Sequence, residues 1–95
     1  MVSQKILVQS AYGLHLRPVS LLCQEALKYS CHITLLTETK SVNAKSVLGV
    51  LGACVKQGME IELQCDGEDE TEALEAIVSL LNSISEEEQN EQKLY

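Results

Sequence analysis

The sequence predicts an α+β fold in which a four-stranded antiparallel sheet is covered on one face by three helices. Four segments favour strands through alternating or β-branched apolar content, two others carry an apolar stripe at helical spacing, and a third reads as a short apolar helix. They follow one another in the order strand, helix, strand, strand, helix, strand, helix. Alternating strands need cover on one face only, and amphipathic helices supply it. A chain of 95 residues has room for a single domain, which we place at residues 1–85, ahead of an acidic tail over 86–95 that we expect to fray.

The first strand is expected over Val2–Val8, where apolar side chains mostly alternate with polar ones. The next segment, Ser10–Gly13, breaks this pattern, and Gly13 supplies a backbone that adopts a positive φ without penalty. Pro18 is tolerated in the first turn of a helix, so a helix is expected from there to about Tyr29. Its apolar residues recur at spacings of three and four and give one buried stripe.

The second and third strands, Cys31–Thr37 and Lys40–Asn43, are expected to pair as a hairpin. A short apolar helix is expected over Val47–Val55 with Ser46 as its N-cap, and its two internal glycines indicate that it leans on its neighbours.

The fourth strand, Met59–Cys65, shows the clearest alternation, which predicts a sheet with one wet face. Asp69 and Glu72 then stand at the positions of a capping box, and the apolar stripe of the last helix ends at Ile84.

Charge and composition exclude several classes of function. The net charge of −7 is the sum of about +4 through Gly58 and −11 from Met59 onward, which argues against nucleic acid and makes the first half the place to look for a bound anion. The four cysteines contain no C-x-x-C pair, so we expect buried free thiols and neither disulfides nor a metal site. No cofactor is indicated. No apolar run approaches the roughly 20 residues of a membrane-spanning helix, and no secretory signal is visible, so we expect a cytoplasmic protein without membrane insertion.

The segment Gly13–Pro18, which reads Gly-Leu-His-Leu-Arg-Pro, combines a permissive glycine, an imidazole, a cation and a helix start. Backbone N–H groups of a first helical turn, here those of Leu16 and Arg17, favour an anion, and the planar fork of Arg17 suits phosphate oxygens. A neutral imidazole is a nucleophile toward phosphorus, and the N–P bond that it forms is easily transferred onward. On these residues alone, an exposed histidine beside an arginine is an equal alternative.

Residues from Met1 to about Ser85 resemble HPr, the histidine-containing phosphocarrier family of the bacterial sugar phosphotransferase system, in its low-GC Gram-positive form. Gly13–Pro18 matches the active-site motif of that family, and Val42–Val50 resembles its regulatory-serine segment. The resemblance implies an open-faced β-sandwich. It also implies a phosphoryl carrier, not an enzyme, in which Nδ1 of His15 accepts the phosphoryl group and Arg17 stabilises it.

The same resemblance implies the partners. Enzyme I would charge His15, and the EIIA domains of sugar permeases would receive the group. HPr kinase/phosphorylase would phosphorylate Ser46, and the phosphoserine form would bind the catabolite control protein. Leu16, Val47, Leu48 and Leu51 would dock partners, because an apolar run of this length cannot all face the core.

Two alternatives stay open. Paralogues of the Crh type use the serine but lack the histidine, so His15 favours the carrier. A carrier for a specialised branch would fit Tyr12 and Leu16, which replace the small or polar residues usual in the family. Monomer and domain-swapped dimer are both compatible with the sequence.

Overall fold

The computed structural model describes residues 1–10 and 12–93, with side chains described through Glu86. Four antiparallel strands form one sheet: β1 (Val2–Leu7), β2 (His32–Leu36), β3 (Ser41–Asn43) and β4 (Glu60–Asp66), in the order β1-β4-β2-β3. The pairing places Ile6 opposite Ile61, and Leu35 opposite both Leu63 and Val42. The predicted sheet and its hairpin are therefore confirmed.

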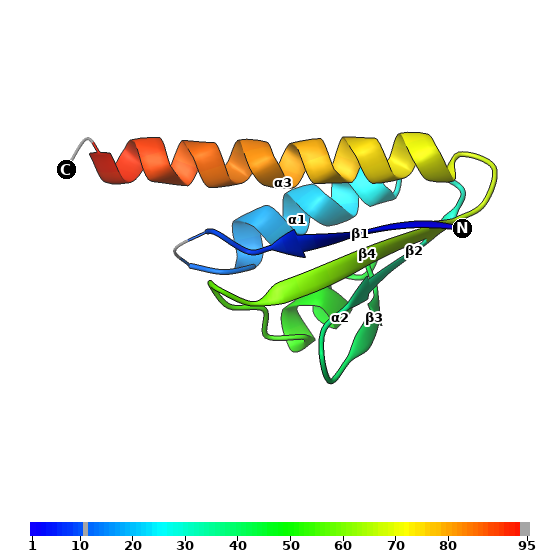
Figure 1. Cartoon of the computed structure of the whole chain (residues 1–95), viewed down its shortest axis with the longest axis horizontal. Coiled ribbons are helices and arrows are strands. Elements are labelled where there is room, and N and C mark those ends of the chain that lie inside the picture. Colours follow the sequence, from blue (N-terminus) through cyan, green and yellow to red (C-terminus); the bar gives the residue numbers. More distant parts are fainter. Residues whose placement is uncertain (11, 94–95) are drawn as a thin grey trace.

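Three helices accompany the sheet: α1 (Leu16–Ala26), α2 (Val47–Gly52) and α3 (Glu70–Lys93). Figure 1 shows α3 running along the length of α1 and of β1, with α2 beside β3 at the other end of the sheet. The core lies between helices and sheet, and its largest fully buried apolar side chains, apart from Pro18, are Val19, Leu22, Leu35, Val50, Ile61, Leu63, Cys65 and Ile77. The α+β architecture expected from the sequence is present.

Helix boundaries differ from the expected ones for identifiable reasons. Pro18 is the third residue of α1 and not the first, because none of the first four N–H groups of a helix has an acceptor inside it. α2 ends at Gly52, since Cys54 adopts a left-handed φ of 54° that stops the helix. α3 continues to Lys93 although its apolar period ends near Ile84, because its Glu, Gln and Lys residues are good helix formers on a helix already nucleated.

Asp69 does not close a capping box with Glu72. Its carboxylate instead accepts the backbone N–H groups of Ser30 (2.9 Å) and Cys31 (3.0 Å), across the sheet end. These bonds, that from Ser30 foremost, lower the pKa of Asp69. The start of α3 is thereby tied to the segment that enters β2.

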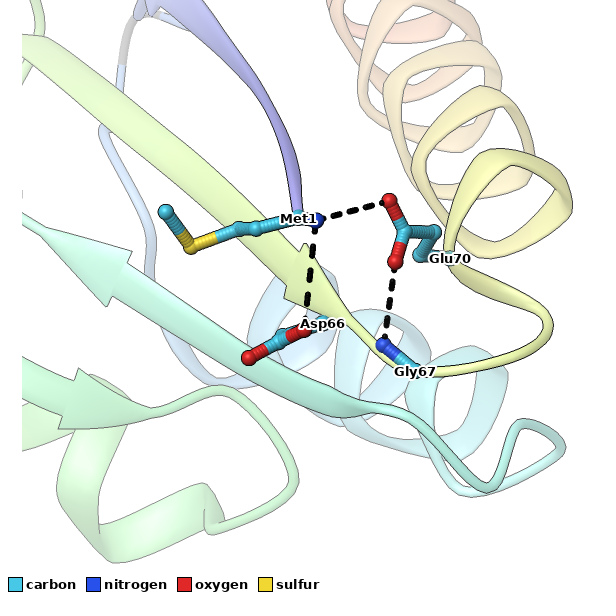
Figure 2. Close-up of polar contacts among 4 residues, drawn as sticks. All are labelled: Met1, Asp66, Gly67 and Glu70. Carbon is cyan, nitrogen blue, oxygen red and sulfur yellow. Dashed lines mark hydrogen bonds and ion pairs between the residues drawn. The ribbon is translucent and has the colours of Figure 1, made fainter.

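The chain's first residue is tied to the same end of α3 (Figure 2). The α-ammonium of Met1 lies 3.0 Å from Oε2 of Glu70 and 3.9 Å from Oδ1 of Asp66, while Oε1 of Glu70 accepts the N–H of Gly67 at 3.2 Å. The hydrogen bond to Glu70 raises the pKa of the amine above 8.0, and the same bond lowers the pKa of Glu70. β1 and α3 are therefore joined by charge as well as by packing.

The cysteines are buried with one exception. Cys23, Cys31 and Cys65 are buried, and burial is the main cause that raises the pKa of the Cys31 thiol to about 11. Cys54 is exposed, which corrects the expectation that all four thiols lie in the core. Within residues 1–10 and 12–93, no cluster of His, Cys, Asp and Glu is arranged to hold a metal ion. Over the same residues, no helix combines the length and apolar character needed to span a membrane.

Candidate functional site

His15 occupies the N-cap of α1, directly before the helix begins. Its backbone is extended (φ −92°, ψ −172°), and its carbonyl oxygen accepts the N–H of Val19 at 3.0 Å, which closes the first turn. The imidazole is half-buried and so remains partly accessible. A helix start carries about half a positive charge, so this position favours any negative charge that the side chain acquires.

The loop before His15 is pinned by backbone contacts. The N–H of Gly13 donates to the carbonyl of Ser10 at 3.1 Å, and the hydroxyl of Ser10 donates to the carbonyl of Gly13 at 3.2 Å. The N–H of Leu14 donates to the carbonyl of Val55 at 3.0 Å. Gly13 has a φ of 65°, and a Cβ there would collide with the Val55 carbonyl oxygen. Only glycine fits where this loop crosses the segment that follows α2.

Arg17 lies in the first turn of α1, two residues beyond His15, and its side chain is exposed. Leu16 stands between them with 62% of its surface exposed. The structure thus places a cation and the positive end of α1 on the same short stretch as the imidazole. This electrostatic setting favours an anionic group near the imidazole.

An aromatic side chain also lies against the imidazole. The rings of Tyr12 and His15 are edge to face, with centroids 5.8 Å apart and an interplanar angle of 85°. Tyr12 is 69% exposed. Sequence reasoning noted Tyr12 as unusual but did not foresee this contact.

Ser46 caps α2, as the sequence predicts. Its hydroxyl oxygen accepts the N–H of Gly49 at 3.0 Å, and its carbonyl accepts the N–H of Val50 at 3.0 Å. Because α2 has six residues, Ser46 stands roughly 9 Å of helix away from the end that leads to Val55 and the His15 loop. Ser46 thus begins α2, whereas the His15 loop contacts the segment that follows the end of α2.

The four candidate docking residues differ in exposure. Leu48 is 83% exposed and Leu16 is 62% exposed, while Val47 and Leu51 are half-buried and pack against the core. α1 and α2, which carry these residues, pack against each other. Apolar surface is therefore offered from both helices.

Two supporting residues were missed by sequence reasoning. Ser10 is buried and closes the turn before His15, and the pattern that could have found it is a serine three residues before a glycine. Val55 contributes through its backbone carbonyl alone. No local pattern marks a residue that acts in this way.

Known proteins resemble this chain in both sequence and structure. A family model described as "PTS HPr component phosphorylation site" matches residues 2–83. The chain is 40% identical over 84 residues to the phosphocarrier protein HPr of Lysinibacillus sphaericus, covering 88% of this chain and 96% of that protein. It is 42% identical over 79 residues to the HPr-like protein Crh of Bacillus subtilis, covering 83% of this chain and 93% of that protein. The solved structure of a histidine-containing phosphocarrier protein from Mycoplasma superposes with a TM-score of 0.87 at 34% identity, covering 88% of this chain and 96% of that one.

Proposed function

The chain belongs to the PTS-HPr family of phosphocarrier proteins, and on that premise we propose that it carries a phosphoryl group on His15. Phospho-enzyme I supplies the group, and EIIA domains of sugar permeases receive it, in the cytoplasm. The observation that supports this most directly is the placement of a half-buried imidazole at the N-cap of α1, on a loop that Gly13 and Val55 hold in place.

The transfer step uses the neutral imidazole. The lone pair of Nδ1 attacks the phosphorus of the donor phosphohistidine, an N–P bond forms, and the donor's N–P bond breaks with its electron pair returning to the donor nitrogen. The proton on Nε2 of His15 stays in place. The reverse geometry, with an EIIA histidine as the nucleophile, discharges the carrier. No cofactor takes part in either step.

Arg17 and the helix start support the group while it is in transit. The guanidinium of Arg17 is exposed two residues beyond His15, and its planar fork of donors suits the oxygens of a phosphoryl group on the imidazole. The backbone N–H groups of Leu16 and Arg17 belong to the positive end of α1. Both effects favour the phosphorylated form without requiring the fold to change.

We propose that Ser46 is a regulatory site for HPr kinase/phosphorylase. Its hydroxyl oxygen takes the γ-phosphoryl group of ATP, an O–P bond forms as the bond to ADP breaks, and the hydroxyl proton is lost. The product adds close to two negative charges to the face that carries α2. That charge opposes docking of acidic partners at His15 and supplies the recognition feature for the catabolite control protein.

Leu48 and Leu16, with contributions from Val47 and Leu51, form the docking surface in this proposal. The first two expose most of their side chains at the faces of α2 and α1. A small apolar patch with a cation beside it suits a transient and specific interface.

A second candidate is a regulatory protein of the Crh type, which acts through phosphorylated Ser46 alone. The 42% identity to Crh of Bacillus subtilis supports this second candidate. His15 separates the two, because a purely regulatory protein has no chemical need for a nucleophile at a pinned helix start.

The experiment that tests the carrier mixes the protein with enzyme I and phosphoenolpyruvate and measures intact mass. One added phosphoryl group, labile in acid and missing from His15→Ala, is the expected result. Absence of label with an enzyme I that charges a known HPr, together with ATP-dependent labelling of Ser46 by the kinase, would transfer the protein to the regulatory class.

A further inference from the structure

Tyr12 is held close to His15 by the loop that joins them. Its ring lies edge to face with the imidazole at a centroid separation of 5.8 Å and an angle of 85°. The backbone between them is fixed at Gly13, by Ser10, and at Leu14, by Val55. The hydrogen bonds at Gly13 and Leu14 therefore constrain the backbone that connects the two rings.

Tyr12 does not serve the core. Its side chain is 69% exposed, and it is absent from the group of apolar residues that pack between helices and sheet. A large aromatic ring in this position contributes little buried area to folding. Its described ring contact is with the reactive side chain itself.

We infer that Tyr12 is a positioning residue for phosphoryl transfer, which limits rotation of the His15 ring so that one nitrogen stays directed at the partner. This inference rests on the proposed carrier function. Edge-to-face aromatic pairs are favourable because the positive rim of one ring meets the negative face of the other. A half-buried imidazole without such a neighbour samples more ring orientations, and fewer of them align the nitrogen with phosphorus.

The size of the effect follows from the usual strength of aromatic pairs. Such pairs shift an orientation equilibrium by about two- to tenfold. Loss of the Tyr12 ring should therefore lower the rate of phosphoryl transfer to His15 by about two- to tenfold. The affinity for the partner should not change comparably.

Docking is the competing explanation, since the Tyr12 side chain is exposed on the loop that leads to His15. A docking residue acts through contact area with the partner, so its loss raises KM. A positioning residue acts before the partner arrives, so its loss lowers kcat and changes the free protein.

The test compares Tyr12→Ala, Tyr12→Phe and Tyr12→Leu with the parent chain. Phenylalanine keeps the ring, whereas leucine keeps apolar area without a ring, so the pair separates aromatic geometry from docking area. NMR of the free proteins reads the His15 ring protons, which a neighbouring aromatic ring shifts. Steady-state phosphorylation by enzyme I reads kcat and KM.

The expected result is a changed His15 ring signal and a two- to tenfold lower kcat in Tyr12→Ala and Tyr12→Leu, at unchanged KM and unchanged urea midpoint, with Tyr12→Phe like the parent. Equal kcat in all four proteins, or a raised KM at constant kcat, overturns the inference while leaving the carrier intact. If the parent chain itself takes up no phosphoryl group, the carrier function fails and the inference fails with it.

Discussion

Replacement of Gly13 by alanine tests whether the His15 loop depends on a close backbone crossing. The residue has a φ of 65°, and this left-handed conformation costs an L-residue about 1–2 kcal/mol. The new methyl group would overlap the Val55 carbonyl oxygen and lie 2.8 Å from Cα of Lys56. Both are backbone atoms that cannot rotate away, and overpacking of this kind costs about 1–3 kcal/mol. The free energy of unfolding should fall by about 2–5 kcal/mol in all.

Two other glycines provide matched controls. Gly58 has a φ of 88° but open space around its Cβ position, so Gly58→Ala should lose only the conformational part, about 1–2 kcal/mol. Gly52 lies in α2, also in open space, and Gly52→Ala should gain about 0.5–1 kcal/mol from helix propensity.

Urea unfolding followed by circular dichroism ranks the three variants through their free energies of unfolding. The expected order of stability is Gly52→Ala above the parent, then Gly58→Ala, then Gly13→Ala. If Gly13→Ala loses no more than Gly58→Ala, the contact with Val55 does not constrain the loop and the reasoning is refuted. Folded Gly13→Ala should also accept phosphoryl groups more slowly, because His15 is displaced.

Three further predictions concern stability elsewhere. The raised pKa of the Met1 amine means that its ion pair with Glu70 stabilises the fold below pH 8.0. This contribution is lost as pH rises through the raised pKa. The urea midpoint of Glu70→Gln should therefore lie below that of the parent at neutral pH and equal it in strong alkali. The lowered pKa of Asp69 means that its contribution to the free energy of unfolding is present above pH 3.8 and is lost as pH falls through the lowered pKa. Asp69→Ala should therefore be less stable than the parent at neutral pH. Its free energy of unfolding should also fall less steeply in acid. Cys54→Gly removes a left-handed cysteine and should raise the free energy of unfolding by about 1 kcal/mol, which an unchanged urea midpoint would contradict.

Much of the fold follows from local pattern. The alternation from Met59 to Cys65 predicted the central strand β4, and the apolar stripe ending at Ile84 predicted the buried face of α3. Ser46 was found as an N-cap because its chemistry acts within three residues. These features are set by neighbours along the chain, which a sequence displays directly.

Features that the sequence did not reveal depend on contacts between distant segments. Asp69 looked like a local cap, yet its oxygens bond Ser30 and Cys31, because the sheet brings that turn within reach. Cys54 was expected to be a core thiol. It is exposed, and it follows the end of α2 with a left-handed backbone. Each of these outcomes was decided by tertiary position, which overrides residue type.

Backbone contacts hold the His15 loop, whereas Leu16 of α1 and Leu48 of α2 expose their side chains to solvent. The His15 loop is fixed by Gly13, Leu14 and the carbonyl of Val55, and its described contact with that segment runs through backbone atoms. Leu16 and Leu48 lie outside the core, and substitution of such exposed residues usually changes stability by less than about 0.5 kcal/mol. If the proposed function holds, substitutions at Leu16 and Leu48 should alter partner choice without displacing His15, whereas a substitution at Gly13 should displace His15 itself.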